Sequence, residues 1–185
     1  WIEQRKGLHV VIEALARLAS EFPCLHLDVL GLPAHALYQA QVEQLAVERG
    51  IAERVRFRGR IGREERVGGL RRAFLVAIPE QWENMSPVIL TEAMAAGACV
   101  LASRVGGIRQ FVEEFSSGLL AKRDDPAEFA ERMRWAMNHS GEIAAMAARA
   151  RRRAKELFDP NSINTRTLAL YRSLVGVRKQ GAPRG

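Results

Sequence analysis

The chain has 185 residues, of which 48% are hydrophobic, and its 28 Lys and Arg residues outnumber 21 Asp and Glu residues to give a formal net charge of +7. A chain of this length buries about 70% of its unfolded surface, so length and composition predict one globular domain or slightly more. No apolar run approaches the roughly 18 residues of a membrane-spanning helix, which argues against an integral membrane segment.

The first third of the chain predicts alternating helix and strand. Apolar side chains recur at helical spacing between Leu8 and Phe22, and they form one stripe. Leu25–Leu30 is a predicted strand, and Ala34–Arg49 is a predicted helix that a glycine stops. Val55–Gly59 alternates apolar and basic residues, which is typical of a short strand.

The middle of the chain predicts a strand, a loop, a helix and a second strand. Phe74–Ile78 is a short apolar run typical of a buried parallel strand. After a polar loop, Ser86 stands where a helix N-cap belongs and Pro87 where the first helical residue belongs. The helix continues over Val88–Ala96, and the next strand covers Ala98–Ala102. This is one βαβ unit, which should be right-handed.

The other elements follow the same alternation. The helix expected over Arg63–Ala73 should fray or kink at Gly68-Gly69. After the central unit we expect a helix at Ile108–Phe115, a strand at Leu119–Ala121, a helix capped by Asp125 with Pro126 first, and helices at Glu142–Leu157 and Ser162–Val175. The predicted fold is an α/β, Rossmann-like open parallel sheet with helices on both faces, whose first strand would lie before Trp1.

The start of the helix at Val88 is the most informative point for function. The first N–H groups of a helix lack partners inside it, and its dipole makes that end partly positive, so an anion gains roughly 0.3–1 kcal/mol there. Glu83 precedes this point in the loop, and Glu92 lies inside the helix. The residues alone allow two interpretations, a phosphate site flanked by two carboxylates or two merely solvated acids.

This stretch resembles the donor-binding half of the family 4 glycosyltransferases, which are retaining nucleotide-sugar enzymes of the GT-B fold. Their pattern is a strand ending in Pro, two glutamates separated by seven residues, and then a strand followed by Gly-Gly. The second glutamate of that pattern begins the motif EAMAxG. Here Glu83, Glu92–Gly97 and Gly106-Gly107 fill those places. The two glutamates are separated by eight residues, which we interpret as one extra loop residue, Met85 or Ser86.

The resemblance implies how the chain is organised. Residues 1–176 would form the nucleotide-sugar-binding, C-terminal half of a GT-B fold, and residues 177–185 a disordered tail. An N-terminal acceptor-binding domain would lie outside this sequence, together with an Arg that grips the donor pyrophosphate. The last helix, which carries a Leu-Tyr-Arg-x-Leu ending, would return toward that domain.

The resemblance also implies the site. Lys6, in a matching Lys-Gly pair, would bind the diphosphate, and Glu83 would hold hydroxyls of the donor sugar; these two residues would be catalytic. Glu92 would accept hydrogen bonds from the ribose. The remaining implied donor contacts are Gly59, Arg60 and Ile61 at the base, the loop residues Asn84 and Met85, the helix-start residues Ser86, Pro87, Val88 and Ile89, and Gly106 and Gly107. The two glycines permit either close approach of a ligand or a tight turn.

The activity implied is transfer of a sugar from a UDP- or GDP-sugar to an acceptor, with retention and without a metal or another cofactor. Lys6 and the helix-start N–H groups would neutralise the charge on the leaving diphosphate. Two alternatives stay open, a nucleotide-sugar epimerase of GT-B architecture and a non-catalytic nucleotide-binding module. The shifted glutamate spacing and Glu80, where the family often has Ser, would permit the second.

Charge and cysteine usage bear on the surroundings of the protein. Five cations, from Arg149 to Lys155, share one late helix, which can be a solvated face or can face an anionic membrane or acceptor. No nucleic-acid motif accompanies them, so no nucleic-acid partner is expected. Cys24 and Cys99 lie in or beside apolar segments, which predicts buried, reduced thiols and a cytoplasmic protein, peripheral to the inner face of the membrane if the basic face binds lipid. The four histidines are scattered, so no metal site is expected.

Overall fold

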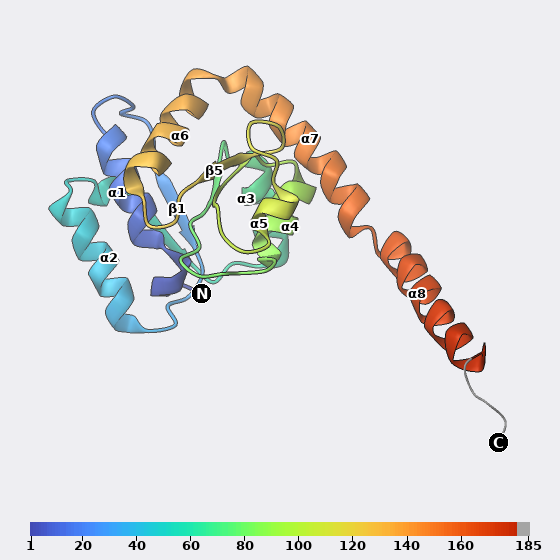
Figure 1. Cartoon of the computed structure of the whole chain (residues 1–185). Coiled ribbons are helices and arrows are strands. Elements are labelled where there is room, and N and C mark those ends of the chain that lie inside the picture. The colour runs from blue at the N-terminus through green and yellow to red at the C-terminus, as the bar shows by residue number, and fades with distance from the viewer. Residues whose placement is uncertain (181–185) are drawn as a thin grey trace.

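The computed structural model of the chain describes residues 1–180, in which strands and helices alternate (Figure 1). The strands are β1 (Leu27–Leu30), β2 (Val55–Gly59), β3 (Val76–Ile78), β4 (Val100–Ser103) and β5 (Leu119–Ala121). The α-helices are α1 (Leu8–Leu18), α2 (Ala36–Glu48), α3 (Arg63–Arg72), α4 (Val88–Ala96), α5 (Ile108–Phe111), α6 (Pro126–Asn138), α7 (Ser140–Phe158) and α8 (Pro160–Gln180).

The strands pair in parallel throughout, as predicted, but they form two sheets. One sheet has the order β1-β2 and the other the order β3-β4-β5. Within residues 1–180 no strand pairing joins these two sheets. The Rossmann-like α/β class is therefore confirmed, whereas the single open sheet that we expected is divided between β1 and β3.

Helices cover both faces of the three-stranded sheet. Val100 and Ala102 of β4 belong to a core shared with α4 and α7, and Leu101 belongs to the opposite core shared with α1 and α6. Burying one such leucine stabilises the fold by roughly 1.5–3 kcal/mol. A central strand that is apolar on both faces is typical of a doubly covered parallel sheet, as the alternation predicts.

Helix α1 links the two sheets through different sides of its surface. Val11 and Leu18 pack in the core of the three-stranded sheet, whereas Ile12 and Leu15 pack in the core of β1, β2 and α2. Next to β1, the buried Ile2 forms an isolated parallel bridge with Pro33. The chain at residue 2 therefore already runs beside the exit of β1 and in the same direction.

Several predicted boundaries are off by a few residues. α1 ends at Leu18 rather than Phe22, and a turn follows it up to Phe22, which Pro23 biases away from helical backbone. α5 ends at Phe111 rather than Phe115, which has a φ of 57° that an α-helix does not allow. The capping of α6 is as predicted, since the Asp125 carboxylate accepts from the backbone N–H of its third helical residue.

Two other expectations were wrong. The Gly68-Gly69 pair does not interrupt α3, and the N–H of Ala73 still donates to the carbonyl of Gly69 at 2.9 Å. Cys99 is buried as predicted, and burial raises the pKa of its thiol to about 11. Cys24, in contrast, is exposed in the turn that precedes β1.

Helix α8 leaves the body at the end of α7 (Figure 1). It continues through residues 177–180, which we had assigned to the tail, and residues 181–185 lie outside the described residues. Its apolar side chains Leu170, Tyr171 and Leu174 are 57%, 59% and 57% exposed. Within residues 1–180, no helix combines the length and the apolar character that crossing a bilayer requires.

Candidate functional site

The start of α4 presents unpaired donors, as predicted, although its cap is shifted by one residue. Pro87 rather than Ser86 is the N-cap, with extended backbone at a ψ of 126°. The Ser86 N–H donates to the side-chain oxygen of Asn84 at 3.3 Å. Within residues 1–180 the N–H groups of Val88 and Ile89 have no hydrogen-bond acceptor. These two donors, at the positive end of the helix dipole, are available to an anion.

The carboxylate of Glu83 and the Gly106-Gly107 turn lie together. One oxygen of Glu83 accepts from the N–H of Gly106 at 2.6 Å, and the other lies 3.5 Å from the guanidinium of Arg123. The Glu83 side chain is 69% exposed, so it retains free acceptor capacity toward solvent. Sequence reasoning identified Glu83 and both glycines but not Arg123, which falls in a polar stretch without any motif.

The two glycines make room for the chain itself. A Cβ at Gly106 would overlap the carbonyl of Asn84, and one at Gly107 would overlap the carbonyl of Met85. The N–H of Gly107 also donates to the Asn84 carbonyl at 3.1 Å. Of the two interpretations in the sequence analysis, the close approach is thus made by the loop before α4, which the glycines hold in place.

Lys6 is anchored to the loop that follows β3. Its ammonium donates to Glu80 Oε1 at 2.7 Å, and the indole N–H of Trp82 donates to Glu80 Oε2 at 2.6 Å. A Cβ at Gly7, where φ is +71°, would overlap the carbonyl of Pro79, so the Lys-Gly pair and this loop fit closely. Sequence reasoning placed Lys6 at the site and mentioned Glu80 only as a departure from the family. An acid two residues after a predicted buried strand was the signal for its role.

Glu92 has a partner that sequence reasoning missed. Its carboxylate lies 3.0 Å from the guanidinium of Arg66 on α3, and the Glu92 side chain is 34% exposed. The Nε of Arg66 is buried and has no hydrogen-bond partner within the described part of the chain. Arg66 lies in a strongly charged helix, where nothing in the sequence separates it from its neighbours. Glu92 is therefore neutralised by a neighbouring cation instead of standing alone.

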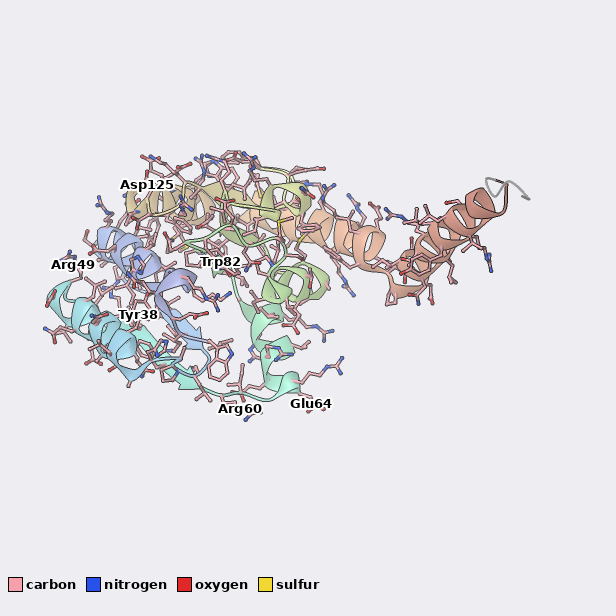
Figure 2. All side chains as sticks on the ribbon, turned by 60° about the horizontal axis from the view of Figure 1, so that its bottom comes forward. Tyr38, Arg49, Arg60, Glu64, Trp82 and Asp125 are labelled. Carbon is pink, nitrogen blue, oxygen red and sulfur yellow. The ribbon has the colours of Figure 1, made fainter. Side chains whose placement is uncertain are left out.

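The predicted base-binding segment lies apart from the other predicted site residues. Figure 2 shows Arg60 on the connection between β2 and α3, away from Trp82. Arg60 is exposed and Ile61 half-buried, and the carbonyl of Gly59 accepts from the N–H of Gly31, the residue after β1, at 2.9 Å. Among residues 1–180 no hydrogen bond joins Gly59–Ile61 to the other predicted site residues. The link is indirect, since α3 follows this segment and Arg66 reaches α4.

An open cleft of about 540 Å³ lies beside the Lys6 anchor. It is lined by Glu3, Gln4, Arg5, His9, His35, Gln81, Arg123 and Asp124. His9, which lines the cleft, lies 2.8 Å from the Tyr38 hydroxyl through its Nδ1, and burial raises the pKa of Tyr38. None of the predicted site residues lines this cleft, although Arg5, Gln81 and Arg123 are neighbours or partners of them.

A family model described as "Glycosyl transferases group 1" matches residues 2–156. A curated relative, the D-inositol 3-phosphate glycosyltransferase of Corynebacterium urealyticum, is 33% identical over 184 residues, covering 97% of this chain and 43% of that protein. The phosphatidyl-myo-inositol mannosyltransferase of Mycolicibacterium smegmatis is 25% identical, with coverage of 94% and 43%.

Two solved structures of longer chains are also similar to this chain. The crystal structure of Anabaena HepE in complex with UDP-glucose superposes with a TM-score of 0.85 and 25% identity, covering 93% of this chain and 46% of HepE. A sucrose-phosphate synthase from Thermosynechococcus elongatus gives a TM-score of 0.82 at 25% identity, with coverage of 95% and 44%. The chain thus spans less than half the length of these proteins.

Proposed function

Because this chain belongs to the group 1 glycosyl transferases, we propose that it is the donor-binding part of an enzyme that transfers a sugar from a nucleotide diphosphate sugar to an acceptor. The transfer would retain the configuration at the anomeric carbon and would use no metal or other cofactor. Its named relatives are transferases, which favours transfer over epimerisation or mere nucleotide binding.

The observation that carries the proposal is the loop from Pro79 to Pro87. It anchors the Lys6 ammonium through Glu80 at one end and exposes the free N–H groups of Val88 and Ile89 at the other. In our proposal these positive groups bind the diphosphate and stabilise the charge that it gains when the bond to the sugar breaks. Preorganised donors of this kind usually supply the largest part of a rate enhancement.

The two glutamates would then orient the rest of the donor. Glu83 is exposed and keeps acceptor capacity, so it suits the hydroxyls of the transferred sugar. Glu92 would accept from the ribose hydroxyls while its other interaction is with Arg66. The backbone of Gly59–Ile61 would contact the base. A UDP-sugar or a GDP-sugar is the proposed donor, and the UDP-glucose complex of HepE supports the uridine nucleotide.

We propose further that acceptor binding needs a second domain. The relatives are more than twice as long as the part that this chain matches. The exposed apolar side chains of α8, among them Leu170 and Leu174, suit packing against such a domain. The 185-residue chain alone should therefore bind the donor nucleotide without transferring sugar.

A thermal-shift panel tests the donor proposal. We expect UDP- or GDP-sugars to raise the melting temperature of this chain by mass action, and ADP-sugars to do so less. Transfer is then measured with the full-length protein by product analysis, in which an epimerase would convert the donor without an acceptor. Robust transfer by the 185-residue chain alone would contradict the need for a second domain.

A peripheral contact with an anionic membrane on the cytoplasmic side is a separate proposal. Two of the five α7 cations, Arg149 and Arg153, donate to backbone carbonyls of the body, whereas Arg151, Arg152 and Lys155 are exposed. These three can face lipid. Full-length protein should co-sediment with phosphatidylglycerol vesicles more than with phosphatidylcholine vesicles, and salt should abolish the difference. Equal binding to both vesicle types would overturn this proposal.

A further inference from the structure

Glu80 combines full burial with a full charge. It is only 1% exposed and is the one charged residue that is buried within residues 1–175. It follows β3 by two residues, at the carboxyl edge of the three-stranded sheet. A carboxylate in such a place costs several kcal/mol unless donors compensate it. The proposed donor contacts do not explain why a carboxylate is buried at this position.

Two donors compensate the carboxylate, one at each oxygen. Lys6 supplies a charged donor at 2.7 Å and Trp82 a neutral one at 2.6 Å. The indole ring is itself covered by the guanidinium of Arg5, 4.9 Å from the ring centroid. The Glu80 carboxylate is thus fixed on both sides and cannot move away from the ammonium without losing a hydrogen bond in a dry environment.

The ammonium end of the Lys6–Glu80 pair is accessible to solvent. The Lys6 side chain is 33% exposed, whereas the Glu80 side chain is 2% exposed. An ammonium group has three N–H donors, and one of them is used by Glu80. Within residues 1–180 the two others have no acceptor, and they can face a ligand that arrives from the solvent side. Glu80 therefore lies behind the ammonium and does not compete for the same approach.

Holding a lysine side chain in one conformation before a ligand binds saves more conformational entropy than holding most other side chains. Its flexible four-carbon stem carries about 2 kcal/mol of rotamer entropy, which a ligand would otherwise have to remove on binding. Here the backbone is held as well, because the N–H of Gln81 donates to the carbonyl of Arg5 at 2.8 Å. The ammonium is thus in place before any diphosphate binds.

We infer that Glu80 is a positioning residue, which holds the Lys6 ammonium in the orientation that receives the donor diphosphate. The inference rests on the proposed function and deepens it. Glu80 acts through Lys6 alone and touches no part of the donor. A substitution at Glu80 should consequently alter diphosphate affinity only while Lys6 carries its charge.

A double-mutant cycle on this chain tests the inference, with calorimetric affinity for UDP, or for GDP where it binds more tightly, as the measurement. Glu80→Gln should weaken binding about tenfold, in line with a hydrogen bond to a charged group. Lys6→Gln, which keeps an N–H donor for Glu80, should weaken it by a similar or larger factor. In the Lys6→Gln background, adding Glu80→Gln should change affinity by less than about twofold.

Circular dichroism melting checks that each variant folds. Should Glu80→Gln fail to fold, Trp82→Phe gives a second test, because it removes the other anchor of the carboxylate and keeps the ion pair. It should weaken diphosphate binding about threefold, again only when Lys6 is present.

The outcomes separate this inference from the proposal beneath it. Equal losses from Glu80→Gln with and without Lys6 would mean a structural role only, and unchanged or tighter binding by Glu80→Gln would mean that Glu80 does not position the lysine. Either result overturns this inference while leaving the donor site intact. A wild-type chain that binds no nucleoside diphosphate overturns the proposed function and this inference together.

Discussion

The predicted donor contacts beside the two sheets differ in how firmly the surrounding structure holds them. On the β3-β4-β5 side, the loop before α4 is held by Lys6, by the Gly106-Gly107 turn and by the Glu83 carboxylate. On the β1-β2 side, the predicted base contacts at Gly59–Ile61 are part of a connection in which Arg60 is exposed. In the described part of the chain, no hydrogen bond joins them to the other predicted site residues.

In our proposal, this difference corresponds to what each side would bind. Charge that develops on a diphosphate is stabilised best by donors that do not move, so rigidity is favoured near Lys6 and α4. The base would be contacted by a few backbone groups at the end of β2, which the sheet positions. We therefore expect small substitutions on the β3-β4-β5 side to have large effects on stability and binding. The β1-β2 side should tolerate changes of side chain.

The largest expected effect is on stability. Gly107→Ala forces a Cβ into the carbonyl of Met85, although the φ of −74° suits alanine, and should cost about 3 kcal/mol of unfolding free energy. Gly59→Ala is the matched change on the other sheet, since φ is +65° there but nothing lies within 4 Å. It should cost roughly 1–2 kcal/mol from backbone strain alone. Urea unfolding measures both, and equal costs would remove the distinction between the two sides.

Nucleotide affinity should show the same contrast on a smaller scale. Glu92→Ala removes the proposed ribose acceptor and should weaken nucleotide binding by about 1–3 kcal/mol. Arg60→Ala removes an exposed side chain whose proposed contribution is through the backbone, so affinity should stay within about twofold. Isothermal calorimetry with UDP compares them. A weaker Arg60→Ala variant would assign base recognition to the side chain, and an unchanged Glu92→Ala variant would exclude the ribose role.

Much of this arrangement could be predicted because it depends on local patterns. The strand–loop–helix–strand order around α4, its nine helical residues and its terminal Gly97 follow from apolar runs and turn residues close together in sequence. The family spacing then identified Glu83 and Glu92. The cap lies at Pro87, which has extended backbone, rather than at Ser86, and a difference of one residue at a helix end is one that propensity does not decide.

The partners of the site residues could not be predicted in the same way. Arg66 and Glu92 are 26 positions apart, and Lys6 and Glu80 are 74 apart, so only the folded chain brings them together. The division into two sheets likewise depends on which strand edges meet. Local sequence gives the elements and the residue types, whereas charge pairing across the fold decides which acids stay free for a ligand.

The smallest expected effect concerns an exposed ion pair of the β1-β2 side, which contrasts with the Lys6–Glu80 pair and its buried carboxylate. Arg49 donates twice to Glu13, at 2.8 and 2.6 Å, and this hydrogen bond holds the pKa of Glu13 below its ordinary value of 4.5. A lowered folded pKa means that the stabilisation is present above about pH 4.5 and is lost as the pH falls through the folded pKa.

Glu13→Gln should therefore melt slightly below the wild type at neutral pH, and the difference should vanish as the pH falls through the folded pKa of Glu13. Glu43→Gln is the matched control, because Glu43 lies on the exposed face of α2 and, among residues 1–180, accepts a hydrogen bond only from Gln39. Its difference from the wild type should not change in this way. Circular dichroism melts across this pH range measure both variants. If the Glu13→Gln difference persisted in acid, the stabilisation would come from packing and not from the charge of Glu13. The β1-β2 side would then resemble the rigid β3-β4-β5 side more than its exposed surface indicates.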